Sequence, residues 1–277
     1  MRALAVEMPD LSPTVLDVEG VTMRFGGLTS LDNVSMTVTR GAISAVIGPN
    51  GAGKTSLFNC LTGAYRPQEG QVFFTGSDGT RSQLIGKSPH RITSLGVART
   101  FQNIRLFPAL TALENVQIGV ESRQRSGALS AMLRLRRSRQ DDRDSVTEAV
   151  RLLTFVGLPQ RIHELSSSLP YGDQRRLEIA RALGTKPSLL LLDEPAAGTN
   201  PAEKRDLETL IRQVADSGVS VLLIEHDMRL VMSVASHVTV LNFGKVIAAG
   251  PPASVQRDPA VVEAYLGTAG DAEASDA

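Results

Sequence analysis

The chain has 277 residues, 42% of them hydrophobic, which is enough to bury the core of one large domain or of two closely packed lobes. Its 29 lysines and arginines are balanced by 29 aspartates and glutamates, so no overall charge draws it toward nucleic acid. The single cysteine, Cys60, excludes an internal disulfide and a cysteine-cluster zinc site. The longest apolar runs fall short of the roughly 20 residues that a membrane-spanning helix needs, and the first residues lack the basic start of a secretory signal.

The N-terminal part of the chain is rich in short β-branched stretches that are separated by glycine and polar turns. These stretches predict strands at Val15–Glu19, Val21–Phe25, Val34–Val38, Ala42–Ile47 and Val72–Thr75. The sequence GPNGAGKT interrupts the pattern after the fourth strand, and the run SLFNCLTG that follows it predicts a helix.

From about Pro89 to Leu183 the strand signals fade and helical periodicity takes over. Two continuous apolar runs, LLLLDEP and VSVLLIEHD, then predict strands that are buried on both faces. Between them, Pro201–Asp216 predicts an amphipathic helix, and this order implies a parallel α/β sheet. A late hairpin is expected at Val238–Asn242 and Val246–Ala249.

The predicted organisation is therefore an α/β core that is interrupted by a helical block. We expect a flexible tail over residues 1–13, an α/β core with a β subdomain over 14–95 and 185–250, a helical subdomain over 96–184, a C-terminal helix over 251–267 and a flexible tail over 268–277.

Residues 48–55 match the pattern G-x-x-x-x-G-K-[ST] in full, after an apolar strand and before a helix. The glycines of such a loop let successive backbone N–H groups point at an anion, and the helix N-terminus adds a partial positive charge. Lys54 is expected to reach the outer phosphates, and Thr55 to ligate Mg²⁺. A glycine-rich turn that binds nothing is the alternative. The complete motif in its expected context favours a nucleotide site at Gly48, Pro49, Asn50, Gly51, Ala52, Gly53, Lys54, Thr55 and Ser56.

Polar residues follow both of the later buried strands. Asp193 and Glu194 end the first, where Asp193 would hold Mg²⁺ through water and Glu194 would polarise an attacking water as general base. His226 follows the second at the same sheet edge, placed to orient the γ-phosphate or the water. The alternatives are capping of the next helix for the acids and a structural role for the histidine. The histidines without this context are His90, His163 and His237.

Five motifs occur in one order: GPNGAGKT, TFQ at Thr100–Gln102, LPYGDQRR, LLLLDEP and EHD. Over nearly the whole chain, from about Val15 to Leu266, this order resembles the ATP-binding subunit of ABC transporters. The resemblance implies a P-loop NTPase with a RecA-like parallel-sheet core, an N-terminal antiparallel β subdomain and an inserted helical subdomain. It implies an ATPase with ATP and Mg²⁺ as cofactors, in which Phe25 stacks on adenine and Gln102 contacts Mg²⁺ or water. An ordinary strand phenylalanine and a surface glutamine are the alternatives.

More narrowly, the chain is similar to the branched-chain amino acid importer type, through RTFQNIRLF, LPYGDQRRLEIARAL, LLLLDEPAAGTNP, LLIEHDMRLVM and DPAVVEAYLG. This similarity implies a peripheral protein on the cytoplasmic face of the inner membrane, with no nucleic-acid partner. Its partners would be two integral-membrane permease subunits, a second ATPase of related but different sequence and, indirectly, an extracytoplasmic solute-binding protein. The alternatives are a homodimer, the ATPase of a lipid-extraction or export system, and a soluble non-transport ABC ATPase. Branched-chain amino acids are the leading solute, before other amino acids, urea or small amides.

The stretch LPYGDQRR stands where this family has its signature, usually LSGGQ, which completes the ATP site of the partner subunit. Pro170 replaces the serine, and it offers a phosphate neither a hydroxyl nor an N–H. Either the two ATP sites of a dimer are unequal, or this subfamily manages without the serine. Proline and an early aspartate also suit the start of a helix. The signature residues are Leu169, Pro170, Tyr171, Gly172, Asp173 and Gln174.

Two further features depart from the family pattern. Asn200 falls where an aspartate is usual in the loop after the general base, and its neutral side chain weakens the assignment of that loop's usual charge–dipole contacts across the dimer. A basic insert consists of Arg134, Arg136, Arg137, Arg139 and Arg143, interrupted by Asp141 and Asp142. It is read as a solvated face, as a contact with anionic lipid headgroups, or as a nucleic-acid contact, which the lack of interleaved aromatic residues disfavours.

Overall fold

The computed structural model describes residues 13–122 and 138–265, with side chains from residue 143 onward in the second range. The expected terminal tails therefore lie almost wholly outside the described residues, as do Arg134, Arg136 and Arg137 and the side chain of Arg139 from the basic insert. Within the described ranges, no helix combines the length and the apolar character needed to cross a bilayer.

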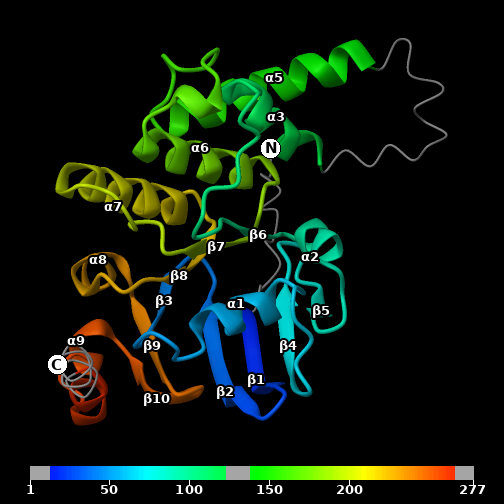
Figure 1. Cartoon of the computed structure of the whole chain (residues 1–277). Helices are drawn as coiled ribbons and strands as arrows, with labels where there is room; N and C mark the ends of the chain where they lie inside the picture. The colour runs from blue at the N-terminus through cyan, green and yellow to red at the C-terminus, as the bar shows by residue number, and fades with distance from the viewer. Residues whose placement is uncertain (1–12, 123–137, 266–277) are drawn as a thin grey trace, which may run out of the picture.

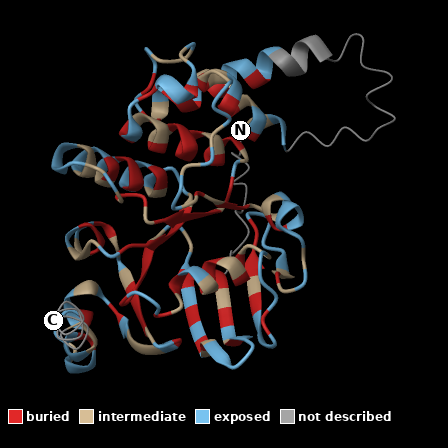
Figure 2. Ribbon diagram, viewed as in Figure 1, coloured by how far each residue is buried: buried red, intermediate tan, exposed pale blue. Residues whose placement is uncertain are grey.

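An antiparallel sheet forms the N-terminal part of the molecule (Figure 1). Its strand order is β2-β1-β4-β5, with β1 (Thr14–Phe25), β2 (Leu28–Thr39), β4 (Glu69–Thr75) and β5 (Arg81–Gln83). The buried and exposed residues of β2 alternate along much of the strand, as expected for a sheet with one face toward a core (Figure 2).

A second sheet of six strands lies at the centre, in the order β10-β9-β3-β8-β7-β6. Its members are β3 (Ile43–Ile47), β6 (Val97–Arg99), β7 (Leu189–Asp193), β8 (Ser220–Ile224), β9 (His237–Asn242) and β10 (Lys245–Gly250). All neighbouring pairs run parallel except the β9–β10 hairpin. The predicted combination of a parallel core with an N-terminal antiparallel sheet is confirmed.

The central sheet is buried on both faces because two different hydrophobic cores meet on it. On β7, Leu189 and Leu191 belong to the core that also contains α1 (Lys54–Leu61) and the antiparallel sheet. Leu190 and Leu192 belong to the core on the other side, with α7 (Pro201–Asp216) and α8 (Met228–Val234). This two-sided burial explains why the sequence of β7 is continuously apolar.

A helical layer made of α3 (Ala112–Glu121), α5 (Ser138–Phe155) and α6 (Tyr171–Gly184) packs together above α7 (Figure 1). The backbones of α3 and α6 touch at two glycines. A Cβ on Gly119 would lie 2.1 Å from the carbonyl oxygen of Arg181, and one on Gly184 would lie 2.9 Å from the amide nitrogen of Val120. Glycine is therefore required sterically at this crossing.

The structure corrects two details of the predicted strands and helices. The strands expected at Val15–Glu19 and Val21–Phe25 are one strand, because Gly20, at φ 59°, allows an irregular register without ending β1. Helix α2 (Pro89–Leu95) is followed by β6, inside the range 96–184 that was expected to be helical. Strand β6 has only three residues, too few to show the alternating pattern of a strand in the sequence. It nevertheless pairs with β7 and belongs to the central sheet.

The C-terminal segment is also not one helix. Helix α9 (Pro252–Val255) ends in a turn, and a second helical segment covers residues 259–265. The carboxylate of Asp258 accepts a hydrogen bond from the Ala260 amide at 2.9 Å, which starts the second segment. Pro259 has no amide hydrogen to continue the first, so the helix breaks between the two.

Candidate nucleotide-binding site

The phosphate loop joins β3 to α1 and depends on glycine at defined positions. A Cβ on Gly48, at φ 150°, would lie 2.0 Å from the carbonyl oxygen of Leu241, and one on Gly53, at φ 101°, would lie 2.5 Å from that of Ser30. Gly51 also has a positive φ, 79°, but has open space around it. The loop therefore keeps its path, and its N–H groups their direction, only with glycine at these points.

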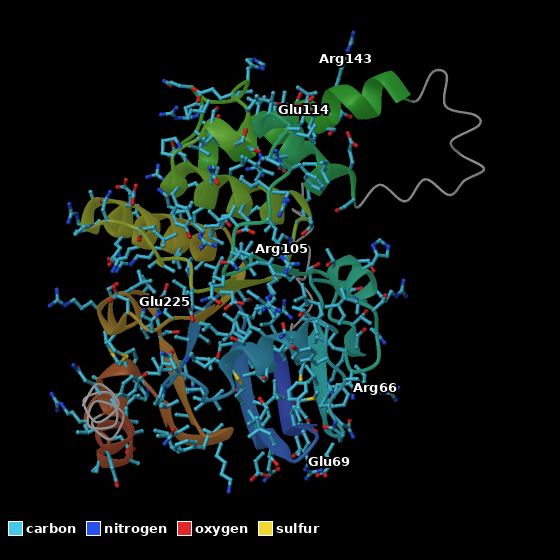
Figure 3. All side chains as sticks on the ribbon, viewed as in Figure 1. Arg66, Glu69, Arg105, Glu114, Arg143 and Glu225 are labelled. Carbon is cyan, nitrogen blue, oxygen red and sulfur yellow. The ribbon has the colours of Figure 1, made fainter. Side chains whose placement is uncertain are left out.

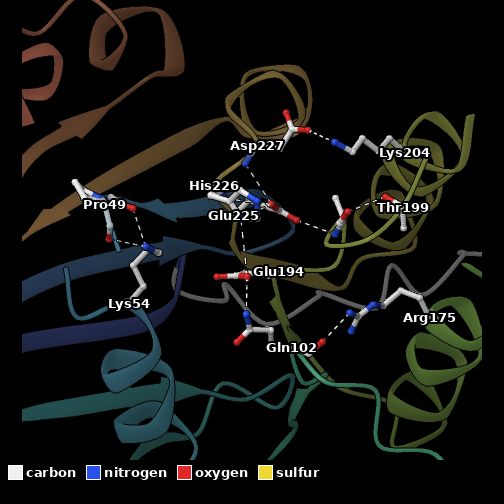
Figure 4. Close-up of polar contacts among 12 residues, drawn as sticks. Pro49, Lys54, Gln102, Arg175, Glu194, Thr199, Lys204, Glu225, His226 and Asp227 are labelled. Atoms are coloured by element: carbon white, nitrogen blue, oxygen red, sulfur yellow. Dashed lines mark hydrogen bonds and ion pairs between the residues drawn. The ribbon is translucent and has the colours of Figure 1, made fainter. Parts of the chain in front are cut away.

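Lys54, the first residue of α1, is buried within this loop (Figure 4). Its Nζ donates hydrogen bonds to the carbonyl oxygens of Gly48 at 2.7 Å and Pro49 at 2.9 Å. Burial lowers the pKa of the Lys54 amine, while the carboxylates of Glu194 and Asp193 act in the opposite direction. The amine is thus placed at the mouth of an anion-binding loop and close enough to both acids to interact with their charges.

An aromatic pair lies near the end of β1. Phe25, 42% exposed, and Tyr65, 38% exposed, form an edge-to-face contact with ring centroids 5.2 Å apart. Phe25 was the sequence-based candidate for stacking on a base. Tyr65 was missed, because it stands in the turn after α1, 40 positions along the chain, and no local pattern links it to Phe25.

The parallel strands β7 and β8 end side by side, with Asp193 opposite Ile224. The next residue, Glu194, has a left-handed backbone with φ 45°, and its amide donates to the carbonyl of Ile224 at 2.9 Å. One oxygen of its carboxylate, Oε2, accepts a hydrogen bond from Nε2 of Gln102 at 2.9 Å and lies 3.8 Å from Nδ1 of His226 (Figure 4). Gln102 and His226, which come from separate sequence motifs, are therefore both brought to the carboxylate of Glu194.

The sequence reading missed Glu225, which holds this edge of the sheet together (Figure 4). Its side chain is fully buried. Oε1 accepts from the amide of Ala196 at 2.8 Å, and Oε2 accepts from the amides of His226 at 3.1 Å and Asp227 at 3.3 Å. Burial raises the pKa of Glu225, and these hydrogen bonds act against that rise. One carboxylate thus ties the loop after Glu194 to the loop that carries His226.

Asp227 adds a second tie between these elements. Its carboxylate accepts from Nζ of Lys204, on α7, at 2.6 Å, and it also caps the N-terminus of α8. The Lys204 ammonium lowers the pKa of Asp227.

The three residues proposed to hold a metal line one cavity of about 620 Å³. Thr55, Gln102 and Asp193 bring a hydroxyl, an amide and a carboxylate, all of which are oxygen donors of the kind that Mg²⁺ prefers. No group of three or more histidine, cysteine or acidic residues is arranged for a metal in the described part of the chain. The fit to Mg²⁺ therefore depends on the hydroxyl and the amide as well as on Asp193.

Arg99, at the end of β6, is a further charged residue in this cavity that the sequence reading missed. Its Nη2 lies 2.7 Å from Oδ2 of Asp193, and its Nη1 donates to Oδ1 of Asn59 at 2.7 Å. The side chains of both Arg99 and Asp193 are almost fully buried. Asp193 therefore has a cationic partner within the protein itself.

The signature segment begins α6. Pro170 is the N-cap residue, one position before the first turn in which proline was expected, and the helix has no side-chain cap. The carbonyl of Pro170 accepts the first backbone hydrogen bond of the helix, from the amide of Gln174 at 2.9 Å, and Nε2 of Gln174 donates to the carbonyl of Leu169 at 2.8 Å. Asp173 lies in the first turn, as its charge favours, and forms an ion pair with Arg161 at 2.9 Å.

Tyr171 and Gly172 lie against neighbouring segments. A Cβ on Gly172 would lie 3.0 Å from the carboxylate of Glu203, so the first turn of α6 approaches α7 closely. The ring of Tyr171, 44% exposed, lies beside Gly198 in the loop that follows Glu194. The signature segment therefore contacts the loop of the proposed general base.

Asn200, the departure from the family pattern, has a local structural role. Its Oδ1 accepts from the amides of Ala202 at 2.9 Å and Glu203 at 3.0 Å, and the Glu203 carboxylate accepts from the Asn200 amide at 2.8 Å. This reciprocal arrangement is a capping box, which asparagine can form at the start of α7. Of the basic insert, the side chain of Arg143 is described, and it projects outward from α5 (Figure 3).

Together, the parallel sheet, the glycine-dependent loop at the start of α1 and the acidic end of β7 define a P-loop nucleotide-binding protein. Comparison with known families narrows this class. Residues 31–197 match the family described as ABC transporter, and residues 245–271 match one described as branched-chain amino acid ATP-binding cassette transporter.

Individual relatives agree with the family matches. The high-affinity branched-chain amino acid transport ATP-binding protein BraF of Pseudomonas aeruginosa is 43% identical over 94% of this chain and all of its own length. The LivG protein of Escherichia coli K12, which has the same description, is 41% identical over the same shares. The ADP conformation of MJ1267, an ATP-binding cassette of an ABC transporter, superposes with a TM-score of 0.78 at 30% identity, over 92% of this chain and all of that one. The chain belongs to the ABC transporter family, in which it is an ATPase subunit.

Proposed function

We propose that this subunit hydrolyses ATP to drive the uptake of branched-chain amino acids. The observation that carries the proposal is the full-length similarity to BraF, at 43% identity, together with the separate match of residues 245–271 to a branched-chain amino acid transporter family. Related small polar solutes are the alternative substrates, because in this proposal the permeases and the solute-binding protein, and not the ATPase, contact the solute.

The proposed roles follow from the geometry of the site. The amides of the phosphate loop and the Lys54 amine hold the phosphates of ATP. Glu194 accepts the proton of the attacking water, with Gln102 and His226 fixing the position of its carboxylate. Thr55, Gln102 and Asp193 would hold Mg²⁺, which when bound supplies positive charge against the phosphates. Phe25, backed by Tyr65, stacks on the adenine ring.

A second ATPase subunit completes the reaction in this proposal. The signature residues lie at the start of α6 in the helical layer, whereas the phosphate loop lies at the start of α1 between the two sheets (Figure 1). This separation supports an arrangement in which each signature segment faces the ATP of the other subunit. The partner is a related but different chain, with a homodimer as the alternative.

Two permease subunits hold the ATPase at the cytoplasmic face of the inner membrane in this proposal. A cavity of about 310 Å³ between β6, α3 and α6 supports such docking, because exposed apolar side chains of Phe107 and Ile118 line it. The guanidinium of Arg181 stacks over the Phe107 ring at 5.7 Å and adds a positive charge there. An extracytoplasmic solute-binding protein acts indirectly, through the permeases.

Uptake of radiolabelled leucine in a deletion strain tests the proposal. Loss of uptake on deletion, with restoration by the wild-type chain and none by the Lys54→Ala variant, is the expected result. Normal leucine uptake in the deletion strain, with loss of uptake of a different labelled solute, would assign the subunit to that solute instead. Retention of the tagged chain in the soluble fraction, with no integral-membrane protein co-purifying, would contradict the transporter role.

A further inference from the structure

Arg175 lies in the second turn of α6, the helix that begins with the signature residues, and is only 1% exposed. Arginine is normally a surface residue, and its burial carries a desolvation cost that an apolar side chain of similar volume would avoid. The next residue, Arg176, shows the usual behaviour, since it forms an exposed ion pair with Asp206. The buried guanidinium therefore has a more specific use than filling space.

The guanidinium of Arg175 holds the loop that carries Gln102. Its Nη1 donates to the carbonyl of Phe101 at 2.6 Å, and its Nη2 donates to the carbonyl of Gln102 at 2.9 Å. Residues 101–107 have no regular secondary structure, so no helix or sheet ladder pairs these carbonyls. Two donors of one planar group thus fix the backbone on which the Gln102 side chain stands.

Glu178, one turn further along α6, secures the other end of the same loop. Its Oε1 accepts from the amide of Arg105 at 3.2 Å, and its Oε2 lies 3.2 Å from Nη1 of Arg175. Burial raises the pKa of Glu178, while the charges of Arg175 and Arg181 act against that rise. The buried positive charge of Arg175 is therefore balanced locally, and the loop is attached to α6 at two places.

Arg175 also contacts the exposed end of the signature segment. Its Nη2 lies 3.1 Å from the hydroxyl oxygen of Tyr171, and its guanidinium lies 5.8 Å from the centre of the Tyr171 ring. On the far side of the loop, the Gln102 side chain donates to Glu194 (Figure 4). A continuous series of contacts thus runs from Tyr171 through Arg175 and Gln102 to the carboxylate of Glu194.

We propose that Arg175 is a positioning residue that fixes Gln102 and, through Gln102, the carboxylate of Glu194. The position in which it holds them depends on the position of the N-terminal end of α6, where the signature residues lie. The inference rests on the proposed function, in which Tyr171 belongs to the segment that faces the partner's ATP and Glu194 is the general base. Because the signature segment serves the partner's site and Glu194 serves the subunit's own, Arg175 links the two ATP sites of a dimer.

Hydrogen–deuterium exchange on the full chain tests the structural half of this proposal. Arg175→Lys keeps the charge but cannot donate to both carbonyls in the same fork geometry. We expect amide exchange over residues 101–107 to rise about tenfold in Arg175→Lys, with the strands of the parallel sheet unchanged. Arg176→Lys is the matched control and should exchange like wild type. Equal exchange in Arg175→Lys and wild type would overturn the proposal.

Steady-state kinetics of the assembled transporter test the functional half. Arg175→Lys should lower kcat about tenfold and leave KM for ATP within about twofold, as expected for misplacement of a catalytic group rather than loss of ATP binding. Combined with Gln102→Ala, it should lower kcat no further than Gln102→Ala alone, because both act through one side chain. Additive losses in the double variant would overturn the proposal.

Two controls distinguish a failure of this proposal from misfolding of the variant and from a failure of the proposed function. If Arg175→Lys does not fold, Tyr171→Phe decides, since it removes only the hydroxyl that contacts Arg175. It should raise exchange over residues 101–107 about threefold, and wild-type exchange would refute the link. If the wild-type complex hydrolyses no ATP, the proposed function fails, whereas the exchange experiment still reports on Arg175.

Discussion

Oδ2 of Asp193 lies 2.7 Å from Nη2 of Arg99, and both side chains are almost fully buried. Asp193 is the carboxylate proposed to hold Mg²⁺, so the arginine and the metal would act as alternative or joint partners of one buried charge. Removing one member of a buried ion pair leaves the other charge without compensation.

Arg99→Met should therefore lower the free energy of unfolding by about 3–5 kcal/mol in the absence of nucleotide. Addition of Mg²⁺ and ATP should recover more of the melting temperature in this variant than in wild type, because the metal then compensates Asp193. Thermal unfolding with and without Mg²⁺-ATP measures both effects. Arg81→Met, which breaks an exposed pair with Asp17, is the matched control. An equal ligand-induced shift in Arg99→Met and wild type would contradict the shared role of Asp193.

Glu194→Gln should abolish hydrolysis while ATP binding persists. Glutamine keeps the size of the side chain and an oxygen for the Gln102 hydrogen bond, but it cannot accept the proton of water. We expect kcat to fall by about 10²–10⁴, with ATP-bound dimers accumulating in size-exclusion chromatography. Glu208→Gln, in the middle of α7, is the control and should hydrolyse ATP as wild type does. Normal turnover in Glu194→Gln would remove Glu194 from the catalytic role.

Pro170→Ser should change both the helix and the partner's ATP site. Serine at the N-cap can accept from an amide of the first turn of α6, which now has no side-chain cap, so the free energy of unfolding should rise by about 1 kcal/mol. If the two ATP sites are unequal because Pro170 lacks a hydroxyl, the variant should also bind ATP more tightly at the partner's site. Site-resolved binding and turnover measure this, with Pro170→Ala as the control that restores the backbone N–H without adding a hydroxyl. Unchanged binding in Pro170→Ser would show that the serine is dispensable in this subfamily.

Cys60 should be unreactive in the native protein. It is fully buried in α1, and burial raises the pKa of its thiol to about 12, so almost no thiolate exists at neutral pH. Maleimide labelling at pH 7 should therefore proceed only through unfolding, and bound Mg²⁺-ATP should slow it by stabilising the native state. Rapid labelling of the native protein, at the rate seen in denaturant, would disprove the burial of this thiol.

Continuous sequence signals predicted the elements that carry the site. The phosphate loop is one contiguous motif, and the apolar runs of β7 and β8 report two-sided burial directly. Helix α7 was predicted with its observed bounds, Pro201–Asp216, because a capping residue, a proline and an amphipathic period all agree there.

The buried charges could not be predicted in the same way. Arg99 meets Asp193 across 94 positions of sequence, and Arg175 meets Gln102 across 73. In sequence, Arg175 and Arg176 look alike, yet Arg175 is buried and Arg176 is partly exposed, since only the packing of the Gln102 loop over α6 distinguishes them. Nothing in the run EHD distinguishes Glu225 from its polar neighbours, although the glutamate forms more of the hydrogen bonds at that edge.

The contact between Gly119 and Arg181 has a mechanical consequence. Where two helices meet through side chains, rotamer changes can absorb a small displacement of one before the other moves. At this crossing the backbones of the two helices are in direct contact, with no side chains between them to rearrange. A displacement of α3 therefore moves α6 as well. The two helices then behave as a single stiff lever, with one arm at the outer face of α3 and the other at the start of α6. A displacement of α3 near Ile118 would therefore also move α6, including its Tyr171 end.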